Sequence, residues 1–345
     1  MNVLVIGAGY VGLVSAACFA KFGAKVTCVD TDEHKIEQLN LGAIPIYEPG
    51  LELLIESGVK LDRLSFQVAS PKPVADADLI FLAVGTPARQ SDGHADLAYV
   101  YAAVEHLAVN LKGYTLIVDK STVPVGTAKQ VVRIIKGLNP EADFDVASNP
   151  EFMREGTAIE DFLQPDRIVL GLETEKARRL LLDLYSPLIS DNIPLVTTNL
   201  ESAELIKYAS NAFLATKISF INEMSQLCEA VGADVTAVAL GMGLDARIGT
   251  RNLQAGPGFG GSCFPKDILA LSRLAQEHGT SCKIVESVVE VNATQKAKMV
   301  QKIRNALGGE VGKHITILGL TFKPDTDDMR DAPALAIIPP LIDMG

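Results

Sequence analysis

The chain has 345 residues, of which 48% are hydrophobic and 21% charged. At about 150 residues per domain we expect two or three domains, and this composition excludes a disordered chain. Lys and Arg number 31 against 42 acidic residues, and the net charge of −11 argues against nucleic-acid or anionic-membrane partners.

The first part of the chain alternates apolar and amphipathic segments. Short, continuous, β-branched runs predict buried strands at residues 3–6, 25–29, 78–84, 115–118, 144–147 and 167–170. Helical spacing of apolar residues predicts helices at residues 11–22, 32–39 and 97–111. Strands that alternate with helices form a parallel sheet, so we expect an α/β, Rossmann-like domain over residues 1–198.

The sequence changes character after residue 198. Residues 201–231 contain no Gly or Pro and carry apolar residues at helical spacing, which predicts one long helix with a core or dimer role. Further helices are expected at residues 234–240, 267–277 and 284–307, giving an all-helical middle domain over residues 199–308. A strand signal at 314–320 and a helix at 334–342 predict the start of a second Rossmann-like domain over residues 309–345, which we expect to be truncated.

The cysteines indicate the compartment. The chain has five of them: Cys18, Cys28, Cys228, Cys263 and Cys282. Their odd number, their wide spacing and the lack of a CxxC pair argue against a disulfide framework or a zinc site. The N-terminus lacks the pattern of a signal peptide, and no uncharged apolar run of about 18 residues occurs. We therefore expect a cytoplasmic protein with no metal site.

A glycine-rich motif follows the first predicted strand. It is GxGxxG, formed by Gly7, Gly9 and Gly12 with Tyr10 and Val11 inside it. Such glycines allow a tight turn and close approach to a pyrophosphate at a helix N-terminus. Asp30 closes the next strand, where a carboxylate binds a ribose diol and repels a 2′-phosphate. The pattern predicts NAD rather than NADP, and the alternative is a purely structural turn.

Two polar loops end other predicted strands. They contain Thr86 in GTP and Thr122 in STVPVGT. Ligands of an open parallel sheet bind beyond the carboxyl ends of its strands, so both loops are expected to face one crevice. Ordinary helix capping by Ser121 or Thr122 explains the second loop equally well.

Two i, i+4 pairs suggest polar chemistry. Glu151 and Glu155, in NPEFMREG, would point the same way on a helical turn and suit a general base, although a solvated helix start is the alternative. Lys207 and Asn211 lie among apolar residues of the long helix. A lysine in an apolar environment is costly unless it is paired or has a function. Lys207 could therefore stabilise an oxyanion, and the alternative is that it is a surface lysine at the edge of the helix.

The segment GPGFGGSCFPKD is the most informative about catalysis. Pro265 predicts a helix start, which places Cys263 at a helix N-terminus near Lys266, and both features favour the thiolate. Asp267 follows and could orient a base or a water. Because core packing does not account for the surrounding glycines, we interpret Cys263 as a nucleophile and the other cysteines as inert. With NAD it would permit two successive oxidations, from alcohol through thiohemiacetal and thioester to acid.

These motifs together resemble the UDP-glucose/GDP-mannose dehydrogenase family, which oxidises a sugar alcohol to an acid with two NAD. The matching segments run in family order: GAGYVG from Gly7, GTP from Gly85, STVPVGT from Ser121, NPEFMREGTA from Asn149, Lys207 to Asn211, GGSCFPKD from Gly260 and FKPDTDDMR from Phe322. The resemblance implies four-electron oxidation of UDP-glucose to UDP-glucuronate. It also implies a further UDP-binding domain, of which the chain carries the beginning.

The resemblance implies a role for each site residue. Cys263 would be the nucleophile, and Lys207 with Asn211 and Asp267 would stabilise oxyanions. Thr122 and Asp267 would hold the water that takes the alcohol proton, and Glu151 would serve thioester hydrolysis. Implied cofactor contacts are Gly7, Gly9, Tyr10, Val11, Gly12, Asp30, Lys35, Thr86, Thr122, Glu155, Lys266 and Arg330. Implied substrate contacts are Glu151, Phe152, Met153, Arg154, Glu155, Lys207, Asn211, Arg247, Gln254, Gly258, Phe259, Gly260 and Lys323, with Arg247 reaching a neighbouring subunit's nucleotide.

Other functions stay open at this point. A sibling enzyme would act on GDP-mannose or a UDP-N-acetylhexosamine, a hydroxyacid dehydrogenase would need no cysteine, and a non-catalytic NAD-binding protein would need none of the polar residues together. The number of NADH formed per substrate distinguishes these functions: two for a double oxidation, one for a single oxidation and none for a non-catalytic protein. The apolar circumference of the long helix predicts a homodimer.

Overall fold

The computed structural model describes residues 1–89, 92–309 and 311–345. The chain divides into two compact units. The first comprises Met1–Arg89 and Ala95–Lys207, and the second comprises Tyr208–Gly345 with the described residues just before Ala95. Each unit has its own hydrophobic core.

The first unit is built on an eight-stranded sheet of order β3-β2-β1-β4-β5-β6-β7-β8. Its strands are β1 (Asn2–Ile6), β2 (Lys25–Asp30), β3 (Leu64–Val68), β4 (Leu79–Leu82), β5 (Tyr114–Asp119), β6 (Asp143–Ser148), β7 (Ile168–Gly171) and β8 (Leu195–Thr198). All neighbours are parallel except β6 and β7, which share one antiparallel pair. The first six strands follow the order of dinucleotide-binding sheets, which confirms the predicted fold class.

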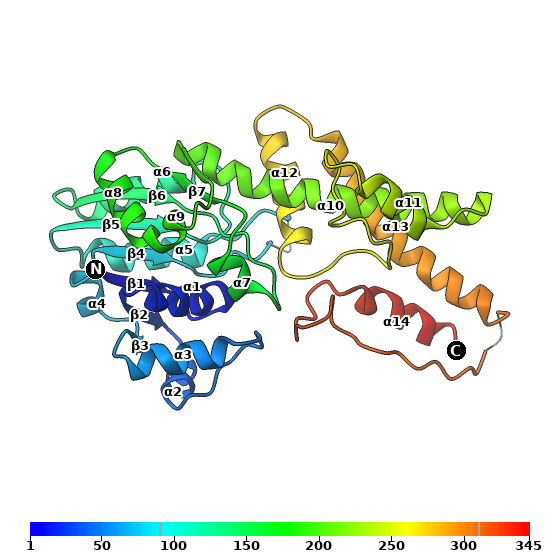
Figure 1. The fold of residues 1–345 in the computed structure, drawn as a ribbon, viewed down its shortest axis with the longest axis horizontal. Helices are drawn as coiled ribbons and strands as arrows, with labels where there is room; N and C mark the ends of the chain where they lie inside the picture. Colours follow the sequence, from blue (N-terminus) through cyan, green and yellow to red (C-terminus); the bar gives the residue numbers. More distant parts are fainter. Residues whose placement is uncertain (90–91, 310) are drawn as a thin grey trace. The chain divides into compact units, whose positions relative to one another are not determined.

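Helices cover both faces of this sheet (Figure 1). One face packs against α1 (Tyr10–Lys21), α2 (Glu33–Asn40), α3 (Leu51–Lys60), α7 (Ala158–Leu163), α8 (Glu175–Leu184) and α9 (Ser186–Ser190). The other packs against α4 (Pro71–Ala75), α5 (Ala98–Ala108) and α6 (Thr127–Leu138). Within β4, Leu79 and Phe81 belong to the first core and Ile80 and Leu82 to the second. A strand buried on both faces reads as a continuous apolar run, which is why the sequence located these strands.

The second unit is helical. The long helix α10 (Leu200–Val231) begins in the first unit and continues into the second, which adds α11 (Val235–Gly243), α12 (Phe264–Glu277), α13 (Lys283–Ala306) and α14 (Pro333–Asp343). Tyr208 and Ala212 of α10 pack against Ala270 and Leu271 of α12. A second small core joins residues of α10, α12, α13 and the loop before α12: Ala215, Ile268, Val288 and Phe259.

One predicted element is wrong. Residues 314–320 form no strand, and Ile315, Ile317, Leu318 and Leu320 are exposed. A strand exists only where a neighbour accepts its hydrogen bonds, and no described residue pairs with this segment. The predicted division at residues 198 and 308 stays a prediction, since the two compact units meet after Lys207. No helix within the described ranges is long and apolar enough to cross a membrane.

Candidate active site

The glycine-rich loop joins β1 to α1 in a way that requires its glycines. Gly7 has φ +106°, and a Cβ on it would lie 2.6 Å from the carbonyl oxygen of Ala83. A Cβ on Gly12 would lie 1.8 Å from the carbonyl oxygen of Gly7. Gly9, by contrast, has open space at its Cβ position. The turn is therefore packed tightly against β4 and α1 while Gly9 leaves room for a ligand at the helix N-terminus, as a pyrophosphate site requires.

Asp30 ends β2 beside this loop. Its carboxylate accepts hydrogen bonds from the Ala8 amide at 2.8 Å, the Asp32 amide at 3.1 Å and the Lys35 ammonium at 3.0 Å. Burial raises the pKa of Asp30, but the two amides and Lys35 outweigh it and hold the pKa below its ordinary value. The group is thus an ionised acceptor at the end of β2, and these residues fit the ribose of NAD.

The two threonine loops meet at the ends of β4 and β5. The Thr86 hydroxyl donates to the Thr122 carbonyl at 2.8 Å, and the Ser121 hydroxyl contacts the carbonyl oxygens of Leu82 and Val84. Thr86 and Thr122 are both buried. The structure therefore brings these loops together at one edge of the sheet, although neither Ser121 nor Thr122 caps a helix.

Glu151 and Lys207 form a buried ion pair, 2.8 Å apart with side chains 5% and 4% exposed. Burial raises the pKa of Glu151, but the Lys207 charge and hydrogen bond, the Met153 amide and Lys120 together keep it below its ordinary value. Lys207 is thus the paired lysine of the long helix and not a lysine at its surface. A buried ion pair is costly to desolvate, which favours a functional reason for keeping it.

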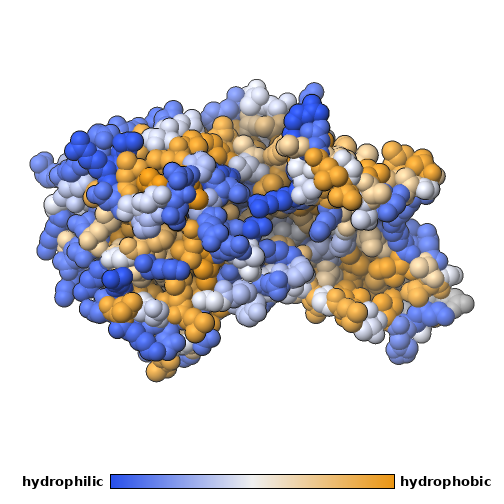
Figure 2. Space-filling model, in the orientation of Figure 1, coloured by the Kyte–Doolittle hydropathy of each residue, from blue (hydrophilic) through white to orange (hydrophobic). Residues whose placement is uncertain are grey.

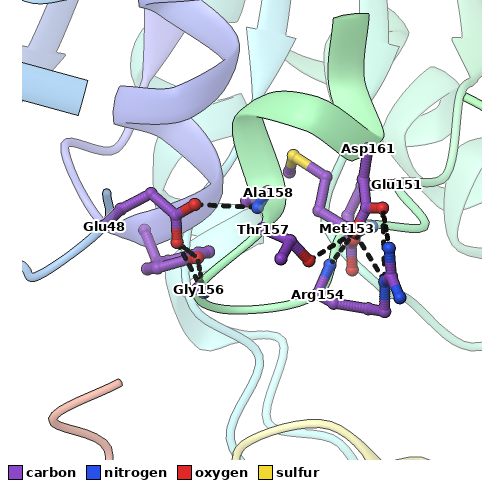
Figure 3. Close-up of polar contacts among 9 residues, drawn as sticks. Glu48, Glu151, Met153, Arg154, Gly156, Thr157, Ala158 and Asp161 are labelled. Carbon is purple, nitrogen blue, oxygen red and sulfur yellow. Dashed lines mark hydrogen bonds and ion pairs between the residues drawn. The ribbon is translucent and has the colours of Figure 1, made fainter. Parts of the chain in front are cut away.

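The helical turn expected for Glu151 and Glu155 is wrong. Residues 149–157 form a loop, α7 begins only at Ala158, and the Met153 amide donates to Glu151 at 2.6 Å (Figure 3). Glu151 is buried and Glu155 half-buried. A carboxylate that accepts from an amide two residues later favours a turn over a helix, which accounts for the difference. Phe152, next in the loop, lies under the Arg167 guanidinium at 3.6 Å.

The second unit holds a separate polar cluster. Asp267, 1% exposed, accepts from the Asn211 amide at 2.6 Å and from the Lys266 ammonium at 2.5 Å. Cys263 is the N-cap residue of α12, as predicted, and its Sγ lies 3.5 Å from the Ser262 hydroxyl. The cluster thus joins a cysteine at a helix N-terminus to a buried carboxylate one turn into the same helix.

Packing does explain two of the glycines before Cys263, contrary to expectation. A Cβ on Gly260 would lie 2.3 Å from the Asp331 carbonyl oxygen, and one on Gly261 would lie 2.7 Å from the Phe322 ring. The Gly261 amide also donates to the Arg330 carbonyl at 2.8 Å. These contacts tie the loop to the segment that carries Lys323 and Arg330. The identification of Cys263 as a nucleophile therefore depends on its helix terminus and polar neighbours, not on its glycines.

Comparison with known proteins covers most of the chain. The UDP-glucose/GDP-mannose dehydrogenase family matches through its NAD binding domain at residues 1–189, its central domain at 201–294 and its UDP binding domain at 316–345. The chain belongs to this family.

Individual relatives agree. A UDP-glucose 6-dehydrogenase of Rhizobium meliloti (strain 1021) is 56% identical over 100% of the chain and 80% of its own length. The structure of a UDP-glucose dehydrogenase from the hyperthermophilic archaeon Pyrobaculum islandicum has a TM-score of 0.95 and 43% identity, covering 100% of the chain and 80% of its own. The structure of a ternary complex of GDP-mannose dehydrogenase from Pseudomonas aeruginosa has a TM-score of 0.69 and 34% identity, covering 100% of the chain and 79% of its own.

Family membership identifies the dinucleotide as NAD and the chain as an NAD-dependent oxidoreductase. The roles assigned to single residues stay predictions. Arg247, in the loop after α11, is exposed and paired with Asp245, and Arg330 is paired with Asp328. Gln254 is exposed, Gly258 has φ +110°, and the amide of buried Phe259 donates to Asn292 at 2.8 Å. The Lys323 ammonium lies 5.7 Å from the Phe322 ring.

Sequence reasoning missed several buried polar groups around Glu151 and Thr122. Lys120 donates to the Asn149 side chain at 3.0 Å, and burial lowers its pKa to about 8. Both carboxylate oxygens of Asp119 are buried without a hydrogen-bond partner in the described structure. Glu48 and Glu204 are buried as well. Charged residues inside or beside apolar runs are a usable signal for Asp119 and Lys120, which end the run of β5.

Proposed function

We propose that the chain catalyses the NAD-dependent four-electron oxidation of UDP-glucose to UDP-glucuronate. The observation that carries the proposal is Cys263 as N-cap of α12, beside the Asn211–Asp267–Lys266 cluster, in a chain whose other unit has the fold and acidic residue of an NAD site. A single oxidation to a ketone or aldehyde needs no nucleophile, whereas oxidation to an acid needs a hydrated or covalently trapped aldehyde.

In the first unit, Gly7–Gly12 and Asp30 would hold the dinucleotide, with Lys35 beside Asp30 and with Thr86 and Thr122 at the neighbouring strand ends. NAD, when bound, accepts a hydride. Lys207 would stabilise the negative oxygen of each oxidation state, and its pairing with Glu151 keeps the resting charge neutral. Glu151, ionised in this pair, would activate the water that hydrolyses the thioester.

In the second unit, the Cys263 thiolate would add to the aldehyde carbon to give a thiohemiacetal. Loss of the hydroxyl proton and of a second hydride from that carbon, for which a second NAD would be the acceptor, leaves a thioester, and water then releases the carboxylate and the thiol. The amides at the start of α12 favour the thiolate. Asp267, held by Asn211 and Lys266, would orient the water that receives the alcohol proton.

UDP-glucose is proposed over GDP-mannose on similarity. The relative named for UDP-glucose is 56% identical and the GDP-mannose enzyme 34%. Initial rates with UDP-glucose, GDP-mannose and a UDP-N-acetylhexosamine, each with NAD, test this choice. We expect kcat/KM to be highest for UDP-glucose, and a higher value for either other sugar nucleotide would replace it.

We also propose a homodimer formed through α10. Phe213, Phe220 and Leu227 are 66%, 43% and 54% exposed, and their spacing of seven residues places them on one stripe of the helix. Val231 and Leu240 continue the exposed apolar side chains into the end of α10 and α11, where Figure 2 shows orange surface. A row of exposed aromatic and aliphatic residues is typical of an interface.

The proposed compartment is the cytoplasm. All five cysteines are thiols, and Cys18, Cys28 and Cys228 are buried. A nucleophilic thiolate at Cys263 works only while it stays reduced, which a reducing compartment ensures.

A further inference from the structure

The sequence Gly-Thr-Ala occurs at two places in the first unit, and both follow a loop that carries a proposed catalytic residue. Gly126–Ala128 follows the loop of Thr122 and opens α6, and Gly156–Ala158 follows the loop of Glu151 and opens α7. The two glycines have φ +95° and +83°. Thr127 and Thr157 each donate their amide to the carbonyl three residues earlier, at 3.1 and 3.0 Å. Both segments thus make the same tight turn into a helix.

Each turn is held by a glutamate distant in the sequence. Glu204 accepts from the Gly126 amide at 2.6 Å and the Ala128 amide at 2.8 Å, one with each oxygen. Glu48 accepts from the Gly156 amide at 2.6 Å and the Ala158 amide at 2.8 Å in the same way (Figure 3). Glu204 is 2% and Glu48 6% exposed. The two arrangements match in sequence, bond pattern and distance.

A local residue usually satisfies the first amides of a helix. Here Gly126 has no side chain to do so, and Thr157 makes no capping hydrogen bond. A local cap and a remote carboxylate both stabilise a helix terminus, but only the remote one fixes the turn relative to another element. The use of a remote glutamate in both turns therefore indicates that the glutamate fixes the position of the turn as well as stabilising the helix terminus.

The elements that the glutamates connect are those of the site. Glu204 lies one turn before Lys207 on α10, so it ties the Thr122 loop to the helix of that lysine. Glu48 also accepts from the Tyr10 hydroxyl, so it ties the Glu151 loop to the first residue of α1, inside the glycine-rich motif. Asp161 holds the intervening Arg154 at 2.6 Å, which restrains the loop from a second side (Figure 3).

We propose that Glu48 and Glu204 are positioning residues for the oxidation: through the two Gly-Thr-Ala turns, Glu48 sets the place of Glu151 and Glu204 sets the place of Thr122. The inference rests on the proposed function. The two glutamates act on different steps, because Glu151 is assigned to thioester hydrolysis and Thr122 to removal of the alcohol proton.

The test is stopped-flow absorbance of NADH after mixing enzyme and NAD with UDP-glucose. In Glu48→Gln and Glu204→Gln the amide nitrogen faces an N–H donor, so one bond of each pair is lost. We expect kcat to fall between about tenfold and a hundredfold, as small displacements of reacting groups cause. Glu48→Gln is expected to give a rapid burst approaching two NADH per enzyme and then a slow phase. Glu204→Gln is expected to give no burst and a slow first turnover.

The controls are Glu52→Gln, an exposed glutamate on α3, and Glu201→Gln, whose ion pair with Lys129 joins α10 to α6 near the surface. Both remove one negative charge and are expected to behave as the parent. Glu48→Asp and Glu204→Asp separate stability from position, because the charge stays while the side chain shortens by one methylene. We expect the Asp variants to recover the melting temperature of the parent and not its rate.

Three results would overturn the proposal: Gln variants that match their controls, the same burst behaviour in both Gln variants, or a kcat that follows the melting temperature through the Gln and Asp series. The number of NADH that the parent protein makes per UDP-glucose tests the proposed function separately. A parent that makes two NADH per UDP-glucose alongside any of these results leaves the proposed function intact and removes only the positioning role.

Discussion

Cys263 is the residue on which the double oxidation depends. Cys263→Ser is expected to lower kcat for UDP-glucuronate formation by more than about a hundredfold, because a hydroxyl is far less ionised than a thiol and traps the aldehyde poorly. The measurement is product formation followed by chromatography. Cys282→Ser is a matched control, since Cys282 is also an N-cap residue of a long helix, α13. Parent-like activity in Cys263→Ser would contradict the covalent scheme.

Asp30 is expected to set cofactor choice. Asp30→Ala removes the ribose acceptor and the negative charge that repels a 2′-phosphate, so NAD affinity should fall about tenfold or more while NADP binding improves. Titration of both dinucleotides by calorimetry measures this. Asp32→Asn, two residues away, keeps the N-cap of α2 and serves as control. Unchanged NAD affinity without a gain for NADP speaks against the assignment.

Asp119 makes stability depend on pH. Burial, and then the charge of Glu204, raise its pKa to about 8, whereas an unfolded Asp titrates near 3.9. Between these values the folded chain binds the extra proton, so this contribution to stability is present at low pH and lost as pH rises through about 8. Burial raises the pKa of Glu204 to about 7, in the same direction.

Asp119→Asn removes the titration and keeps the shape. We expect the parent to lose stability relative to this variant between pH 5 and 8, by at most about 1.4 kcal/mol for each pH unit. Thermal unfolding of both proteins across this range measures the effect, with Asp62→Asn as an exposed control. Parallel profiles for parent and Asp119→Asn would show that Asp119 does not titrate there.

At the scale of elements, α10 carries the prediction of a dimer. Phe220→Glu places a charge in the middle of the exposed stripe of Phe213, Phe220 and Leu227, and a buried unpaired charge disfavours association. Light scattering at micromolar concentration is expected to give twice the chain mass for the parent and the chain mass for Phe220→Glu. Leu53→Glu, exposed on α3, should stay dimeric. A monomeric parent with intact activity rules out the dimer.

The periodic elements were predictable, and the reasons are local. Strands such as β4 are buried on both faces and read as unbroken apolar runs, while α10 lacks Gly and Pro over its whole length. Residues 314–320 have the same composition as a buried strand but no neighbour in the described structure, and pairing is a property of the fold that composition does not carry. The amphipathic helices α3, α6 and α8 were missed although their apolar residues recur at helical spacing, as Val131, Ile135 and Leu138 do in α6.

The site residues that belong to a recognisable motif were predictable from the sequence. Gly7–Gly12, Asp30 and Cys263 stand in segments whose residue types match their expected task, and Asp30 and Cys263 lie where the pattern placed them. Glu48 and Glu204 were missed because each acts on amides more than 70 residues away, and amides carry no sequence signal. The turn at Glu151 was missed because a spacing of four suggests a helix equally well.

At the scale of the whole molecule, one chain combines an NAD-binding sheet with a cysteine at a helix N-terminus, and its central claim is that these perform two oxidations on one substrate. The most direct test is stoichiometry. Purified protein is incubated with excess NAD and a limiting, known amount of UDP-glucose until the absorbance of NADH stops rising. The account predicts two NADH for each UDP-glucose consumed, with UDP-glucuronate as the product. One NADH with an accumulating aldehyde, or no NADH, would contradict it.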